Sequence, residues 1–372
     1  MSSPSLDLST VEGAKAYLTS TPFASDRIAL LSGGNTNFIF RVHLLTAYEG
    51  QPTVILKHSS SSLPGGLLLP LARQQYEVEA LRRVSGWLPA DAPVRAPRVY
   101  HFDKDAAAVV MEDCGTTAKP LKEAMILNSI SLDNARYIGN ALGEFLAKLH
   151  GWRSGWRGDH VQVFAKHQWA KDIAAWVTYG RLVSTLNGEA DGVPALRDPG
   201  LDMSKEDLEA IRQTAETVSE NMKSANETFV MGDFWPGNIV VDLQGDKVKT
   251  ILVVDWELVR TGVPELDVGQ FCAETHSLSH FYPGTLCAEA AVEAQSAFLG
   301  AYKRGSVPSV EMASAVAVHI GAHLVAWTPR VAWGGKEETR AAVLVGARYL
   351  VEGARRSHDW LRTSLVAPLV PT

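Results

Sequence analysis

Cysteine is scarce in this sequence, and positive charge is not in excess. Only three cysteines, Cys114, Cys272 and Cys287, occur among 372 residues, and none belongs to a Cys-x-x-Cys pair. A disulfide-stapled secreted protein of this size usually has more, so we expect a reducing compartment. The 35 lysines and arginines are outnumbered by 41 aspartates and glutamates, which gives a formal net charge of −6. Without a basic field or a basic cluster, nucleic acid is not an expected partner.

Long hydrophobic runs are also missing. No segment has the roughly 18 uninterrupted apolar residues that a membrane-spanning helix needs, so no membrane association is expected. The N-terminal segment includes Asp7, Glu12 and Asp26 and has no long apolar run, which fits neither a secretory signal peptide nor an arginine-rich transit peptide. We therefore expect a cytoplasmic protein, and the sequence leaves its oligomeric state open between monomer and homodimer.

Several motifs that identify common enzyme classes do not occur. The sequence contains no GxxxxGK[ST], no GxGxxG opening a helix, no HExxH and no GxSxG. Its composition, 46% hydrophobic and 20% charged, is that of a globular protein. At about 150 residues per domain, the length favours two domains or two lobes.

The N-terminal part of the chain has the pattern of a small sheet with one helix. Apolar residues alternate with polar ones, as in half-buried strands, and a Gly-rich turn joins the first two runs. Strands are predicted over 26–31, 38–44, 53–57 and 108–112, and a helix over 72–84.

Beyond about residue 115 helical periodicity dominates. Helices are predicted over 133–150, 169–182, 206–222, 288–302, 313–327 and 338–360, with short strands over 239–242 and 250–254. Asp133 is expected to cap the first of these helices. The sequence therefore predicts an α+β protein with an antiparallel-sheet N-terminal lobe (1–114) and a larger helical C-terminal lobe (115–372).

The densest group of chemically useful residues lies in "VMGDFWPGNIVVD" (230–242) and "ILVVDWELV" (251–259). Asp233 and Asn238 lie five residues apart in a loop interrupted by Gly and Pro, and the following strand leads to Asp255 and Glu257. Phosphoryl transfer needs a carboxylate to accept the proton of the attacking hydroxyl and oxygen ligands for magnesium. Each of these residues can also be explained without catalysis, as a turn residue or as a solvated residue at the end of a strand.

The upstream half supplies complementary groups. Lys57 ends a predicted strand, and Glu77 on the next helix is its expected ion-pair partner, with Glu79 as an alternative on the same helix. Gly33, Gly34 and Asn35 form a turn whose backbone N–H groups can fold over phosphates.

In this order the motifs resemble the aminoglycoside phosphotransferase and choline kinase superfamily, over nearly the whole chain. "GGNTNFIFRV" (33–42) and "DWELVRTGVPELDVGQF" (255–271) look most like its 5-methylthioribose kinase branch. "LSGG", "ILKH", "VMGDFWPGNI", "DWEL" and "AHLVAWT" resemble, in order, segments of fungal 4-hydroxytryptamine kinases. The resemblance implies a bilobal protein-kinase-like fold, with a nucleotide-binding N-terminal lobe and a catalytic and substrate C-terminal lobe. It also implies an ATP- and Mg²⁺-dependent kinase that phosphorylates a hydroxyl of a small molecule.

The resemblance also implies a role for each site residue. Asp233 matches the catalytic base, and Asn238, Asp255 and Glu257 match magnesium ligands. The residues matching ATP contacts are Gly33, Gly34 and Asn35 in the turn, Lys57 with its partner Glu77, and the linker from Glu112 to Cys114, whose backbone reads adenine. Asp267 is expected to support the Asp233 loop by accepting backbone hydrogen bonds.

Two departures from the family pattern bear on the substrate. Many members have His where this chain has Met231, and methylthioribose kinases have an arginine pair where this chain has Ala322 and His323. His323, Trp327 and Trp333 are instead candidates for a pocket that takes a flat or cationic acceptor. We expect 4-hydroxytryptamine or a related hydroxylated aromatic amine. The alternatives are 5-methylthioribose, an aminoglycoside or other amino alcohol, and a catalytically inactive kinase-like binding module.

Overall fold

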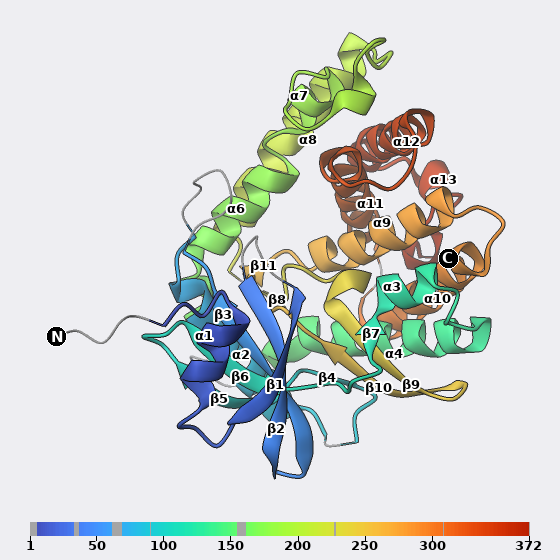
Figure 1. Ribbon diagram of the computed structural model, residues 1–372. Helices are drawn as coiled ribbons and strands as arrows, with labels where there is room; N and C mark the ends of the chain where they lie inside the picture. The colour runs from blue at the N-terminus through green and yellow to red at the C-terminus, as the bar shows by residue number, and fades with distance from the viewer. Residues whose placement is uncertain are drawn as a thin grey trace. The chain divides into compact units, whose positions relative to one another are not determined.

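The computed structural model describes residues 6–32, 37–61, 69–89, 91–154, 161–226, 228–307 and 309–371. The chain forms two compact units, which we describe separately (Figure 1). The first comprises Met1–Ala118 together with Thr250–Glu257, and the second comprises Lys119–Lys249 together with Leu258–Thr372. The late segment 250–257 joins the first unit because its strand β10 (Lys247–Val253) pairs in parallel with β4 (Val94–Arg95).

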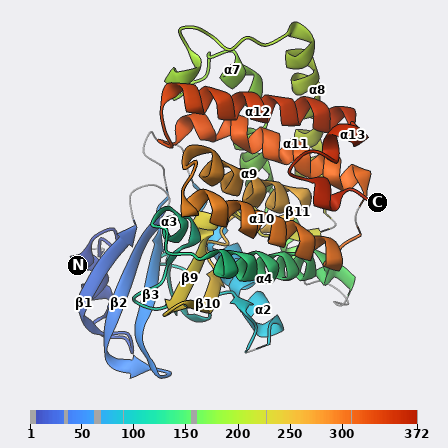
Figure 2. The same cartoon turned by 90° about the vertical axis from the view of Figure 1, so that its right-hand side faces the viewer.

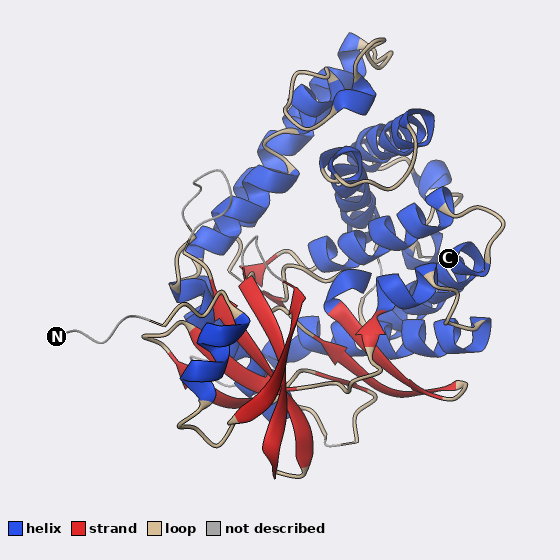
Figure 3. Ribbon diagram, viewed as in Figure 1, coloured by secondary structure: helices blue, strands red, loops and turns tan. Residues whose placement is uncertain are grey.

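The first unit is built on an antiparallel sheet of five strands in the order β1-β2-β3-β6-β5, drawn in red in Figure 3. Its strands are β1 (Ser25–Ser32), β2 (Asn37–Tyr48), β3 (Gln51–Ser59), β6 (Ala108–Glu112) and β5 (Val99–Asp103). Alternate residues such as Phe40, Val54 and Leu56 are fully buried and form a core with Ala14 and Leu18 of α1 (Val11–Leu18). Thr10 caps α1 by accepting a hydrogen bond from the Gly13 N–H.

Helix α2 (Ala72–Trp87) brings charge into the interior of the first unit. Arg73, Gln74 and Glu77 on this helix are almost completely buried beside the apolar residues Val78 and Leu81. Buried charges of this kind need partners, because desolvation of an unpaired ion costs several kcal/mol or more.

The second unit is mainly helical, and its principal helices lie in successive layers in the order α12, α11, α9, α10, α4 (Figure 2). Their bounds are α4 (Leu132–His150), α9 (Glu265–Phe281), α10 (Leu286–Gly305), α11 (Val310–Ala326) and α12 (Lys336–Arg355). Helices α4 and α10 cross closely because Gly139 and Gly143 have no side chain. A Cβ at these positions would lie 2.2 and 2.3 Å from carbonyl oxygens of α10.

Helix α11 is the central helix of this unit. The segment Val310–Arg330 is apolar and long enough to cross a membrane, but 72% of its apolar window is buried inside the protein. It packs between α9 and α12 (Figure 2), which is the place of a core helix.

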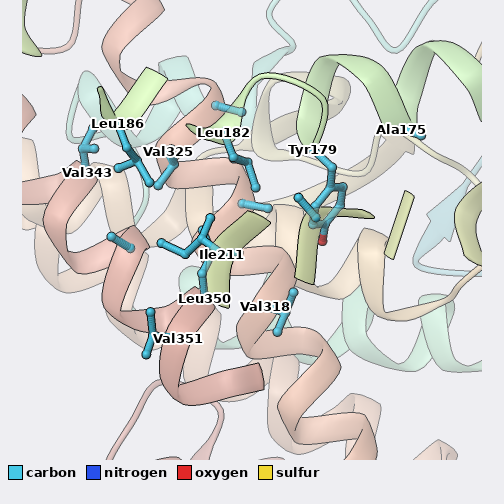
Figure 4. Packing of buried hydrophobic residues seen from close by; sticks show 14 of the residues in the cluster. Ala175, Tyr179, Leu182, Leu186, Ile211, Val318, Val325, Val343, Leu350 and Val351 are labelled. Carbon is cyan, nitrogen blue, oxygen red and sulfur yellow. The ribbon is translucent and has the colours of Figure 1, made fainter. Parts of the chain in front are cut away.

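A second group of helices completes the unit: α6 (Gln168–Thr178), α7 (Leu182–Leu186) and α8 (Lys205–Ser224). Their buried side chains form one apolar cluster with α11 and α12, in which Leu182 and Ile211 lie close to Val325 and Leu350 (Figure 4).

Short strand pairs, β8 (Thr228–Val230) with β11 (Arg260–Gly262) and β7 (Lys119–Pro120) with β9 (Ile239–Gln244), complete the second unit. The smaller helices are α3 (Leu121–Ile126), α5 (Gln162–Ala165) and α13 (His358–Leu361).

The predicted α+β class, with an antiparallel sheet and a larger helical region, is confirmed. Two local predictions are wrong. The cap of α4 is Ser131, which accepts from the Asn134 N–H, while Asp133 lies inside the first turn. The helix predicted over 338–360 is two helices, because Arg356 adopts a left-handed conformation (φ 53°) that ends α12.

Candidate active site

A buried ion-pair cluster in the first unit centres on Lys57. The Lys57 Nζ lies 2.7 Å from Glu77 Oε1 and 2.7 Å from Asp255 Oδ1. The sequence predicted this pairing with Glu77, and the alternative Glu79 instead pairs with Arg83 on the same helix. We call Lys57, Glu77 and Asp255 the Lys57 cluster.

Neighbouring carboxylates keep the Lys57 ammonium charged. Burial by itself lowers the pKa of the Lys57 ammonium, but the carboxylates of Asp255 and Glu77 outweigh burial and raise that pKa above its usual range. Burial raises the pKa of Glu77 to about 7, against the opposing attraction of Lys57. The Trp256 backbone N–H also donates to Glu77 Oε1 at 3.2 Å, so this oxygen ties α2 to the end of β10.

The two acidic residues after β10 are held in different ways. Asp255 is a non-glycine residue with φ of 62°, a strained conformation of the kind found at functional sites, and 28% of its side chain is exposed. The Glu257 carboxylate accepts hydrogen bonds at Oε2 from Asn37 Nδ2 (3.0 Å) and Arg73 Nε (3.1 Å). The Ser59 hydroxyl in turn donates to Asn37 Oδ1.

These carboxylates do not form a complete metal site by themselves. Within the described ranges, no group of three or more His, Cys, Asp or Glu side chains is assembled for a metal ion. Mg²⁺ usually takes one or two protein carboxylates and completes its octahedron with phosphate oxygens and waters. Asp255 and Glu257 offer carboxylates of that number and type.

Arginines hold the segment 112–114, which the sequence comparison predicted to contact adenine through its backbone. Glu112 accepts from Arg95 Nη1 (3.1 Å) and from the Arg98 backbone N–H (3.2 Å), and Asp113 accepts two hydrogen bonds from Arg41. Cys114, which follows, is partly exposed. The predicted phosphate-binding residues Gly33, Gly34 and Asn35 lie outside the described residues.

In the second unit, residues 231–238 form the Asp233 loop. Both carboxylate oxygens of Asp233 accept a side-chain amide: Oδ1 from Gln270 Nε2 at 2.7 Å and Oδ2 from Asn238 Nδ2 at 2.8 Å. Asn238 also donates to the Asp233 backbone oxygen at 3.1 Å. Gly232 is in the left-handed region (φ 84°), and a Cβ there would lie 2.4 Å from the Leu258 carbonyl oxygen.

Asp267 on α9 supports this loop, as predicted. Its carboxylate accepts from the Met231 N–H (2.9 Å) and the Gly232 N–H (2.8 Å), and it lies 3.2 Å from His150 Nε2. Met231 itself is fully buried, and its backbone N–H makes the contact with Asp267. The residue at this position therefore serves the loop through its backbone and packing.

A cavity opens beside Asp233, and we call it the Asp233 cavity. Its polar lining residues are Asp233, Gln270, Thr178, His319 and His323, and the others are Ala174, Val177, Gly232, Leu258, Leu266 and Trp327. Two of the three predicted substrate residues, His323 and Trp327, therefore line one cavity with Asp233. Trp333 does not line it, because its ring stacks on Phe281 with centroids 5.4 Å apart.

The two histidines of the cavity are held by neighbours behind them. His319 Nδ1 lies 2.5 Å from the Tyr179 hydroxyl, and burial lowers the pKa of His319 to about 3, so its ring is neutral. His323 Nε2 lies 2.9 Å from Glu274 Oε1. Both rings are therefore held in position before any ligand binds.

A family comparison decides the enzyme class. Residues 27–307 match the model of the phosphotransferase enzyme family. The chain belongs to this family. It is 31% identical to a 4-hydroxytryptamine kinase of Psilocybe cyanescens, over 97% of both chains. It is 30% identical to a 4-hydroxytryptamine kinase of Psilocybe cubensis, over 89% of this chain and 90% of the relative. Among solved structures, a choline/ethanolamine kinase family protein of Mesorhizobium loti is similar, with 18% identity, 96% and 98% of the two chains covered and a TM-score of 0.47.

Membership of the phosphotransferase family confirms the prediction of a small-molecule kinase. The narrower resemblance to the 5-methylthioribose branch stays a prediction. The individual roles of Lys57, Asp233, Asn238 and Asp255 belong to the proposal below.

Sequence reasoning missed several residues that shape the candidate site of this phosphotransferase. They are Gln270, His319 and Glu274 in the second unit and Asn37 and Arg73 in the first. Gln270 offered one signal, because it lies one helical turn after the aspartate that supports the Asp233 loop. Arg73 offered none, since an arginine at the start of a helix is normally solvated.

Proposed function

We propose that this phosphotransferase transfers the γ-phosphoryl group of ATP to the hydroxyl of a small aromatic amine. One observation carries the proposal: Asp233 lies on the wall of a cavity that also presents Trp327 and His323. A carboxylate next to a partly aromatic cavity is placed to receive the proton of an aromatic alcohol bound there.

Under this proposal the polar groups have defined tasks. Asp233 orients the acceptor hydroxyl and accepts its proton, while the amides of Asn238 and Gln270 hold the carboxylate plane. Lys57 binds ATP phosphates and gives up one of its two carboxylate partners, Asp255, in doing so. Asn238, Asp255 and Glu257 are the residues that would hold Mg²⁺, which would supply charge neutralisation on the phosphates. Positioning and charge neutralisation account for most of the acceleration, because the transition state is loose.

The chemistry of the cavity favours a hydroxylated aromatic amine such as 4-hydroxytryptamine as acceptor. Val177, Leu258 and Leu266 provide apolar walls, and Trp327 provides an aromatic face. The names of two relatives at 30–31% identity support the same acceptor. 5-Methylthioribose is a polar sugar, for which an Arg pair would be expected at the positions that Ala322 and His323 occupy.

ATP consumption with a panel of acceptors tests the proposal. The panel contains 4-hydroxytryptamine, 5-methylthioribose, choline and an aminoglycoside, each with wild type, Asp233→Asn and the exposed-turn control Asp246→Asn. We expect the highest kcat/KM with 4-hydroxytryptamine, and a loss of kcat of about 100-fold or more in Asp233→Asn only. A preference for 5-methylthioribose overturns the acceptor. ATP binding without turnover of any acceptor overturns the kinase and favours an inactive binding module.

A further inference from the structure

Lys122 on α3 places its ammonium group in a cage made by the protein itself. The Nζ lies 3.6 Å from the ring centre of Trp333 and 5.1 Å from that of Trp235. It also lies 3.1 Å from Glu274 Oε2. Two indole faces and a carboxylate are groups that bind organic cations in proteins. Here they bind the ammonium group of the protein's own Lys122.

Glu274 connects the cage to the Asp233 cavity. One carboxylate oxygen accepts from Lys122, and the other lies 2.9 Å from His323 Nε2. The Glu274 side chain is only 9% exposed, so it needs both partners. Burial raises the pKa of Glu274, but its interactions with His323 and Lys122 outweigh burial and lower that pKa. Glu274 is therefore a carboxylate that holds the His323 ring from behind.

Trp235 connects the same cage to the Asp233 loop. It lies between Asp233 and Asn238 in the chain, and its ring covers Gly237. A Cβ at Gly237 would lie 2.2 Å from that ring. The position of the indole and the path of the backbone before Asn238 are therefore coupled. Helix α3 also contacts the short helix η3 (Pro236–Asn238).

We propose that Lys122 is a positioning residue that holds the Asp233 loop and the His323 wall of the cavity in one arrangement. It acts through Trp235 on one side and through Glu274 on the other. The inference rests on the proposed function, since it assumes that the acceptor binds in the Asp233 cavity. Loss of the cation disorders both walls, so acceptor phosphorylation suffers while the Lys57 cluster and ATP binding do not.

Chemical rescue tests this inference. Lys122→Ala removes the ammonium and leaves space, Lys122→Met removes the charge but fills the space, and Lys122→Arg keeps a cation. Lys119→Ala, which breaks an exposed pair with Glu123 nearby, is the matched control. We expect kcat/KM for the acceptor to fall about tenfold or more in the Ala and Met variants, with KM for ATP unchanged. The Arg variant and the control stay near wild type.

Added methylammonium separates positioning from simple loss of stability. It is expected to restore activity in Lys122→Ala but not in Lys122→Met, and to raise the melting temperature of Lys122→Ala more than equimolar potassium does. Wild-type kinetics in Lys122→Met, or a folded Lys122→Ala with neither rescue nor thermal response, overturns the inference. Failure of the proposed function is distinct, because it appears in the wild-type acceptor panel, whereas the thermal response needs no turnover.

Discussion

Gln270 Nε2 donates a hydrogen bond to Asp233 Oδ1 at 2.7 Å, from a helix that lies far along the chain from the Asp233 loop. Asn238 Nδ2 donates to the other carboxylate oxygen of Asp233. The carboxylate plane is therefore set by two side-chain amides, one from the same loop and one from helix α9. A carboxylate has about four lone-pair sites, so these two hydrogen bonds leave Asp233 the capacity to accept another one from the hydroxyl of a substrate. Gln270 thus orients the proposed base without blocking it.

Replacing Gln270 tests this role. Gln270→Leu keeps the volume and removes the amide, so Asp233 gains rotamer freedom. We expect kcat to fall about tenfold while KM for ATP changes less than twofold. Steady-state kinetics measures both, with the exposed Gln213→Leu as matched control. An unchanged kcat in Gln270→Leu would show that Asn238 alone sets the carboxylate.

Gly232 is expected to tolerate no side chain. In Gly232→Ala the Cβ meets the Leu258 carbonyl oxygen at 2.4 Å as well as the strain of a positive φ. We expect a loss of unfolding free energy of about 3 kcal/mol or more, together with loss of activity. Gly245→Ala is the matched control, since the φ of Gly245 is also positive (59°) but nothing lies within 4 Å of a Cβ there. It should cost only about 1 kcal/mol in urea unfolding. Equal losses in the two variants would contradict the steric explanation.

Removing only one partner of the Lys57–Glu77 pair is expected to lower the free energy of unfolding. Lys57→Met leaves Glu77 buried without its cation, and we expect unfolding free energy to fall by about 3 kcal/mol. Adding Glu77→Gln should recover part of that loss, because the uncompensated charge is gone. Urea unfolding of the single and double variants measures the coupling. The surface variant Glu79→Gln is the control and should stay within about 0.5 kcal/mol of wild type. Strictly additive losses would contradict direct coupling.

His167 makes stability depend on pH. Burial lowers the pKa of His167 to about 4 from an ordinary 6.5, although its Nδ1 donates to the Val259 carbonyl at 2.8 Å. Between these values the unfolded chain binds a proton that the folded chain does not, so stability is lost as pH falls below 6.5. The expected contribution of this residue is roughly 2 kcal/mol at pH 5.

His167→Asn isolates that contribution, because its amide can replace the Nδ1 donor but does not titrate. We expect the variant to lose less stability than wild type between pH 7.5 and pH 5, measured by urea unfolding at each pH. Parallel pH dependences in the two proteins would show that His167 titrates normally.

Local patterns predicted the parts of the site that depend on neighbours in the chain. The strand carrying Lys57 and the helix carrying Glu77 follow from periodicity, and their pairing follows because a buried ammonium needs a carboxylate. Trp333 was grouped wrongly with His323 and Trp327 in one pocket. Its ring faces Phe281 and Lys122, and helical spacing cannot show this because Trp333 lies in the loop after α11.

The order of the motifs, the helical and strand periods and the Asp233–Asn238 spacing are properties of the linear chain, and they sufficed for the fold class and the kinase assignment. Packing alone decided which polar groups meet across large sequence separations. Asn37 and Arg73 reach Glu257, Gln270 reaches Asp233, and Lys122 and His323 share Glu274. Such contacts depend on how helices and sheets cross, which is set by the summed burial of many apolar side chains and carries no local signature.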